Sequence, residues 1–177
     1  AGFNALASNW AIATEQATEH GHVMDRNGLR LVGPVHIAET REQAMEDIRF
    51  GFDRWIYYFR EIANLPIVPE GDDPVKAMVD TGLAVIGTPD DAVQRIQQLV
   101  DESGGGFGAF LLMAHNWANW GATRHSYELM ARYVFPHFQN LNDNRHASMS
   151  WVKENKEEFT TQVHGAVGAR IVQHKME

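Results

Sequence analysis

Two short apolar runs constrain the fold more than any other feature of the chain. They occupy residues 29–38 and 107–114. In the first run, apolar residues fill both alternating sets of positions, so both faces of an extended strand would be mostly apolar. Strands of this kind are typical of parallel sheets that helices cover on both sides. We therefore predict two strands buried on both faces, although Pro34 departs from the pattern because proline removes a donor from the ladder.

Helical patterns alternate with these strands. Thr40 and Gln43 form a predicted capping box at the start of one long helix, and Thr88 followed by Pro89 marks the start of another. A brief extended piece precedes Thr88, at residues 83–86. The predicted helices span residues 4–20, 40–63, 75–82, 88–102 and, from a cap at Thr123 to a stop at Pro136, residues 123–135.

This order of elements indicates an α/β fold with a parallel sheet. Two strands alone would leave their edges without partners, so we expect a larger α/β protein of which this chain is the end. A mainly helical domain with a small β element is the alternative. At Asn140 the composition becomes polar and leads into a helical tail over 148–175. We therefore predict two parts, residues 1–139 and 140–177.

Charge and composition exclude several classes of function. The 177 residues carry 15 Lys and Arg against 23 Asp and Glu, a net charge of −8 that disfavours nucleic acid and anionic membrane surfaces as partners. The nine histidines form no His-Glu-x-x-His motif, and cysteine is absent, so no metal site is expected. There is no apolar run of about 20 residues and no basic-then-apolar leader, which together predict a cytoplasmic protein.

Polar and aromatic side chains collect where the two strands end. His36 lies near the end of the first strand, and His115 directly follows the second. In parallel α/β folds, ligands bind beyond the carboxyl ends of the strands. A dry pocket with imidazole and amide groups at its rim is therefore predicted, against the alternative that each histidine is structural. The candidate pocket residues are His36, His115, Asn116, Trp117 and, as a lid, Trp120.

Four segments resemble one family. Residues 31–44 (LVGPVHIAETREQA) look like a late strand–helix junction of the bacterial luciferase-like flavin monooxygenases. Residues 85–93 (VIGTPDDAV) are similar to the Gly-Thr-Pro helix start of that family. Residues 110–117 (FLLMAHNW) and 126–138 (SYELMARYVFPHF) resemble the last barrel strand and helix of its limonene-monooxygenase-like branch. The resemblance covers most of the chain, and its ordered set of motifs is more specific than any one of them.

The resemblance implies a fold and a chemistry. The fold would be a (β/α)8 TIM barrel, of which this chain carries the C-terminal portion, with two barrel strands and a helical tail. The activity would be flavin-dependent monooxygenation: reduced FMN from a separate reductase reacts with O2, and one oxygen atom enters a small apolar organic substrate. A deazaflavin cofactor and a reductase activity of the same fold are the alternatives. His36 and His115 would contact the flavin, and no catalytic residue of the family is carried over.

The tail supports a hypothesis of another class. Apolar residues recur along it at Phe159, Val163, Val167 and Ile171. Such a stripe predicts packing either on another chain or back on the rest of the barrel. The alternative to a catalytic role is that this chain alone is a structural or oligomerisation module. Catalysis would then require the N-terminal part of the barrel. A homo-oligomer is therefore expected.

Overall fold

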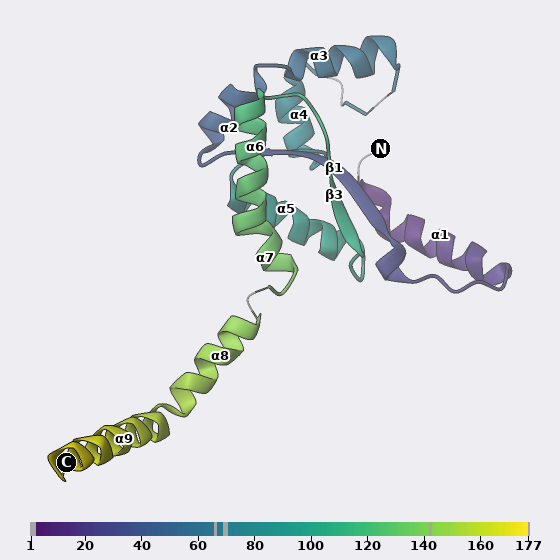
Figure 1. The fold of residues 1–177 in the computed structure, drawn as a ribbon. Helices are drawn as coiled ribbons and strands as arrows, with labels where there is room; N and C mark the ends of the chain where they lie inside the picture. Colours follow the sequence, from purple (N-terminus) through teal and green to yellow (C-terminus); the bar gives the residue numbers. More distant parts are fainter. Residues whose placement is uncertain (1–2, 66, 69–70, 142, 177) are drawn as a thin grey trace. The chain divides into compact units, whose positions relative to one another are not determined.

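The computed structural model describes residues 3–65, 67–68, 71–141 and 143–176. The chain divides into two compact units, residues 1–135 and 136–177. Figure 1 shows the elements of each unit in sequence colours.

A parallel sheet organises the first unit. Its central strand is β1 (Arg30–Ile37), which pairs with β2 (Val85–Gly87) along its last residues and with β3 (Ala109–Met113) along its first. The order is β2-β1-β3, and both pairings are parallel. The predicted α/β class with parallel strands is thus confirmed. The predicted number of strands was too low, because the brief extended piece before Thr88 joins the sheet as β2.

The predicted double burial holds for only part of the sheet. β1 is buried from Gly33 to Ile37, whereas no residue of β3 is fully buried. Val32 and Leu111 are partners in the ladder and are 46% and 47% exposed. The prediction was wrong there because an apolar side chain is buried only where another layer covers its face, which strand periodicity cannot show.

The long helix predicted over 40–63 is interrupted at Gly51. Gly51 donates its N–H to the Trp117 carbonyl at 2.9 Å, and a Cβ at this position would lie 2.1 Å from the carbonyl oxygen of Asn116. This close approach needs a residue without a side chain, and it replaces a helical hydrogen bond by a contact with the loop after β3. The resulting elements are α2 (Arg41–Ile48), α3 (Phe52–Tyr57) and a π-helix (Tyr58–Ile62).

The remaining helices of the first unit follow their caps. Thr88 and Asp91 form a complete capping box at the start of α5 (Pro89–Glu102). Thr40 accepts from the Gln43 N–H as predicted, but the Gln43 side chain donates to Asp47 instead of closing the box. The other helices are α1 (Leu6–Glu19), α4 (Pro74–Asp80) and α6 (Trp120–Leu129), with short 3-10 turns at Phe3–Ala5 and Arg26–Gly28.

The last predicted helix of the first unit differs from the structure at both its predicted cap, Thr123, and its predicted stop, Pro136. Asn119 caps α6 in place of Thr123, so Trp120 belongs to the helix. Beyond α6 the chain continues as a π-helix (Met130–Val134) and then as α7 (Phe135–Phe138). Pro136 does not stop the helical path, because proline is tolerated in the first turn of a helix, where its missing N–H is not needed.

The second unit holds two helices, α8 (Asp143–Glu154) and α9 (Lys156–Met176), separated at Asn155. The single tail helix predicted over 148–175 is therefore two. Neither helix has a buried residue, and the rings of Trp151 and Phe159 lie 5.2 Å apart. Across the described part of the chain, no helix is both long enough and apolar enough to cross a bilayer.

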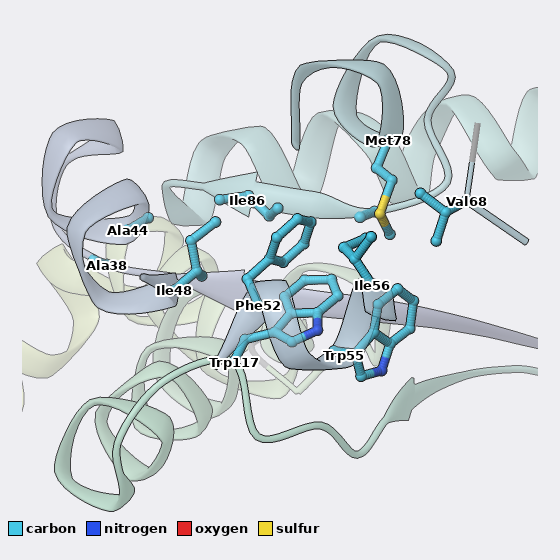
Figure 2. Packing of buried hydrophobic residues seen from close by; sticks show 11 residues of the cluster. Ala38, Ala44, Ile48, Phe52, Trp55, Ile56, Val68, Met78, Ile86 and Trp117 are labelled. Atoms are coloured by element: carbon cyan, nitrogen blue, oxygen red, sulfur yellow. The ribbon is translucent and has the colours of Figure 1, made fainter. Parts of the chain in front are cut away.

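The core of the first unit lies between the sheet and helices α2 to α4. Figure 2 shows how its side chains interlock, with Phe52, Trp55 and Trp117 in mutual ring contact. Met78 of α4 and Ile86 of β2 pack on the same cluster. The cluster comprises Ala38, Ala44, Ile48, Phe52, Trp55, Ile56, Val68, Met78, Ala84, Ile86 and Trp117.

Candidate functional site

The carboxyl ends of the three parallel strands define one edge of the sheet, called here the carboxyl edge. β1 ends there at Ile37, β2 at Gly87 and β3 at Met113. The buried hydroxyl of Ser126 on α6 accepts the N–H of Ile37 at 2.9 Å. Because a buried N–H without a partner is costly, this bond fastens α6 to the end of the central strand.

His36 is fully buried just inside this edge. Its Nε2 lies 3.2 Å from the Asp47 carboxylate, which requires that Nε2 carry the proton. Its Nδ1 is then a bare acceptor, buried and without a partner among the described residues. Burial lowers the pKa of His36 below its usual value, and the Asp47 carboxylate opposes that shift. The ring is therefore neutral near pH 7.

His115 connects β3 to β1. Its Nε2 lies 3.0 Å from the Val35 carbonyl and its Nδ1 accepts the Trp117 N–H at 3.4 Å. These two partners fix the tautomer with the proton on Nε2, since a carbonyl can only accept. Desolvation by burial lowers the pKa of His115. Both ring nitrogens are thus engaged within the chain.

An aromatic chain runs outward from these histidines. His115 stacks on Trp117 with ring centroids 4.2 Å apart, and its ring lies edge-on to that of His36 at 6.3 Å. Trp117 meets Trp55 at 5.2 Å with the planes nearly perpendicular. The buried indole N–H of Trp117 has no hydrogen-bond acceptor among the described residues, and Figure 2 shows it on the side of the Trp55 ring.

The other two predicted pocket residues lie nearer the solvent. Asn116 is exposed and lines a cavity of about 400 Å³ beside α3. Trp120 is 78% exposed at the start of α6 and does not line that cavity. The structure therefore brings His36, His115 and Trp117 together as packed groups, and places Asn116 at the cavity beside α3.

Sequence reasoning missed the residues that share this cavity with Asn116. They are Arg54, Trp55, Tyr58 and Phe59. Trp55 and Phe59 lie at helical spacing within the helix predicted over 40–63, which predicts an apolar stripe that faces the core. Trp55 does pack in the core, and Phe59 is partly buried against it. The available signal was the density of aromatic residues around an arginine in 54–59.

Two ion pairs brace the loops that follow β1 and β2. The Arg41 guanidinium donates to Asp91 through Nε and Nη2, at 2.9 and 2.6 Å, and this contact holds the pKa of Asp91 at about 2. His125 on α6 lies 2.6 Å from Glu39, whose carboxylate raises the pKa of His125. Both pairs are largely solvated, so each contributes little to stability. In the part of the chain that is described, no group of three His, Asp or Glu could hold a metal ion.

Solved monooxygenases share this arrangement of strands and helices. The oxygenating constituent of 3,6-diketocamphane monooxygenase from Pseudomonas putida, a type II Baeyer–Villiger monooxygenase in complex with FMN, superposes with a TM-score of 0.55 at 28% identity, over 76% of this chain and 40% of that one. A monooxygenase from Streptomyces bottropensis gives a TM-score of 0.58 at 16% identity, over 77% and 39%. The second likeness concerns the fold alone.

Curated proteins that are similar in sequence are also monooxygenases. Limonene 1,2-monooxygenase from Rhodococcus erythropolis is 41% identical over 160 residues, which cover 83% of this chain and 41% of that protein. 4-Hydroxyprotoasukamycin monooxygenase from Streptomyces nodosus subsp. asukaensis is 34% identical over 152 residues, 84% of this chain and 41% of that protein. No protein-family model matches the chain.

The predicted resemblance is therefore confirmed: over most of its length, the chain is homologous to flavin-dependent monooxygenases of the luciferase-like family. It spans about two fifths of the length of the curated relatives it matches, 41% in each case.

Proposed function

We propose that this chain forms part of a flavin-dependent monooxygenase that oxygenates a small apolar organic substrate within a (β/α)8 barrel. The homology carries the proposal: relatives at 41% and 34% identity are monooxygenases, and a structural neighbour at 28% identity binds FMN. The three parallel strands would be one arc of that barrel, and their carboxyl edge is where barrel enzymes place their active sites.

The residues at the carboxyl edge fit a planar aromatic group. Trp55 and Phe59 supply ring surfaces to the cavity, and Asn116 supplies an amide whose side chain has no hydrogen bond among the described residues. Asn116 would therefore hold a polar ring edge of the flavin or of the substrate. When bound, reduced flavin supplies the activation of O2.

The two histidines would act as a packed wall behind this surface. Their tautomers are set by Asp47, the Val35 carbonyl and the Trp117 N–H, so they hold the loop after β3 in place. Together with Trp117 they exclude water from the inner side of the edge, which protects a reactive oxygenating species. Direct contact of His36 or His115 with the flavin remains part of the proposal, as does a lid role for Trp120.

The proposed enzyme would need a cofactor supply and two substrates. Reduced FMN would come from a separate reductase, and O2 and an apolar substrate would enter the barrel in a cytoplasmic enzyme. A deazaflavin and a reductase activity are the alternatives that the same fold would allow.

A structural role is a second candidate, and one observation favours it. α8 and α9 bury no side chain of their own, although Phe159, Val163 and Val167 form an exposed apolar stripe on α9. Apolar stripes of this kind usually pack on another surface. A homo-oligomer formed through the tail would account for it, and sedimentation of the protein with and without residues 140–177 tests this role.

The catalytic proposal is tested with protein expressed from its whole reading frame. Reduced FMN, and separately a reduced deazaflavin, are added without oxygen and binding is followed by absorbance. ¹⁸O2 and a panel of cyclic hydrocarbons and ketones are then supplied, and products are analysed by mass spectrometry. One ¹⁸O atom per product molecule is expected with FMN. Protein that binds neither reduced cofactor and consumes no O2 with any compound would contradict the proposal.

A further inference from the structure

The cavity beside α3 has an apolar floor and a polar rim. Its volume is about 400 Å³. Trp55 and Phe59 form the floor, with ring centroids 4.4 Å apart, and Trp55 is itself backed by Trp117 and Phe52 of the core. Figure 2 shows Trp55 next to Trp117 in the cluster. The floor is therefore rigid, because each ring is held by another ring behind it.

The rim carries polar groups that bond to no other side chain or backbone group among the described residues. Arg54, Tyr58 and Asn116 line the cavity, and none of their side chains has a hydrogen bond or ion pair within the described residues. Elsewhere in the first unit, arginines at positions 26, 41 and 95 are bonded to carbonyls or carboxylates. An arginine and an amide without hydrogen bonds to the described residues, both at one cavity, are groups available to a ligand, and both can donate to an oxygen acceptor.

The backbone that carries the rim is unusual at the same place. The helix changes from α to π at Tyr58, and the Ala63 N–H donates to the Tyr58 carbonyl, five residues back, at 2.8 Å. This wider turn begins at Tyr58 and contains Phe59, two of the residues that line the cavity. Single π turns inside helices occur frequently at functional sites.

From these observations we infer that the cavity binds a ring-bearing organic molecule through one sp² oxygen. The ring lies on Trp55 and Phe59, and Arg54 and Asn116 donate to a carbonyl or carboxylate oxygen. This inference rests on the proposed function, because it narrows the substrate class of that enzyme to ring compounds whose otherwise apolar body carries one ketone or carboxylate group, rather than plain hydrocarbons. Arg54 is the residue that determines this specificity.

The test measures binding in the absence of flavin and of turnover. Three naphthalenes of similar size are titrated by calorimetry: 2-naphthoate, 2-acetylnaphthalene and 2-ethylnaphthalene. We expect the carboxylate, the ketone or both to bind at least about tenfold more tightly than the ethyl compound, since a hydrogen bond from a charged donor is worth that much. The compound that gains identifies the oxygen group. Arg54→Met removes the gain, and Arg54→Lys retains part of it.

The control variant is Arg49→Met, which removes an exposed arginine paired with Glu46 outside the cavity lining. It should bind all three compounds as the unaltered protein does. Equal affinity for the three compounds, an unchanged gain in Arg54→Met, or displacement of naphthoate by FMN would each overturn the inference. Failure of this binding test leaves oxygenation measurable by the ¹⁸O2 experiment, so the two proposals fail separately.

Discussion

Two parts of the sheet are both rich in apolar residues but differ in burial, although Leu31 in the amino half is buried as well. At the amino half, Val32 and Leu111 face each other in the ladder and are nearly half exposed. At the carboxyl half, His36 and Ile37 are almost completely buried, although one of them is polar. The difference teaches that hydrophobicity alone does not decide burial in this fold. The cover supplied by α2, α6 and the loop after β3 decides it.

Removing one side chain that covers the carboxyl half and one that belongs to the amino half should give the largest contrast. Trp117→Ala takes away a fully buried indole in contact with Phe52, Trp55 and His115, and we expect the free energy of unfolding to fall by about 3–5 kcal/mol. Leu111→Ala should cost about 1 kcal/mol or less, because its side chain is already half in water. Urea unfolding measures both, and equal losses would show that the two halves do not differ as described.

A smaller effect is expected from the hydroxyl that fastens α6 to β1. Ser126→Ala leaves the buried N–H of Ile37 without its acceptor and should lower the free energy of unfolding by about 1–3 kcal/mol. Ser150→Ala on exposed α8 is the matched control and should change stability by less than about 0.5 kcal/mol. If amide hydrogen exchange at Ile37 is no faster in Ser126→Ala, the bond is not what protects that end of β1.

Acidification should weaken the carboxyl half first. Burial lowers the pKa of His36 and His115, whereas the unfolded chain binds these protons near the usual value of 6.5. The unfolded state therefore gains protons that the folded state resists, and stability that is complete above pH 6.5 declines as the pH falls below it. Urea unfolding at about pH 7.5 and about pH 5.5 measures the decline.

Two variants sharpen the pH experiment. His115→Gln should reduce the decline in stability, because it removes one of the two histidines whose pKa burial lowers. His125→Gln should make it steeper, since Glu39 raises the pKa of His125 and that pair stabilises the folded state at low pH. A pH dependence that neither variant alters would assign the titration to other groups.

Local patterns were enough to predict the framework. The apolar runs placed both long strands, and parallel topology then placed His36 and His115 at one edge, where their rings are 6.3 Å apart. Thr88 and Pro89 marked the start of α5 correctly, because a cap and a proline in the first turn act within a few residues of the chain.

What the sequence did not show depends on contacts between distant segments or on a change of helical period. The break at Gly51 is set by the backbone of Asn116 and Trp117, more than 60 positions away. The cavity at Arg54 was hidden because an apolar stripe at helical spacing explains Trp55 and Phe59 without any ligand. The π turn at Tyr58 alters the 3.6-residue period on which that reading relied.

The imidazole of His115 has a consequence for proton movement at this edge. Its Nδ1 accepts a backbone N–H and its Nε2 hydrogen faces a backbone carbonyl, so a second proton on the ring would displace the Trp117 amide. Because its two ring nitrogens hold the loop after β3 against β1, His115 cannot also transfer protons without breaking one of these hydrogen bonds. A general acid or base at the carboxyl edge would have to be a side chain whose polar atoms are not already hydrogen-bonded within the chain.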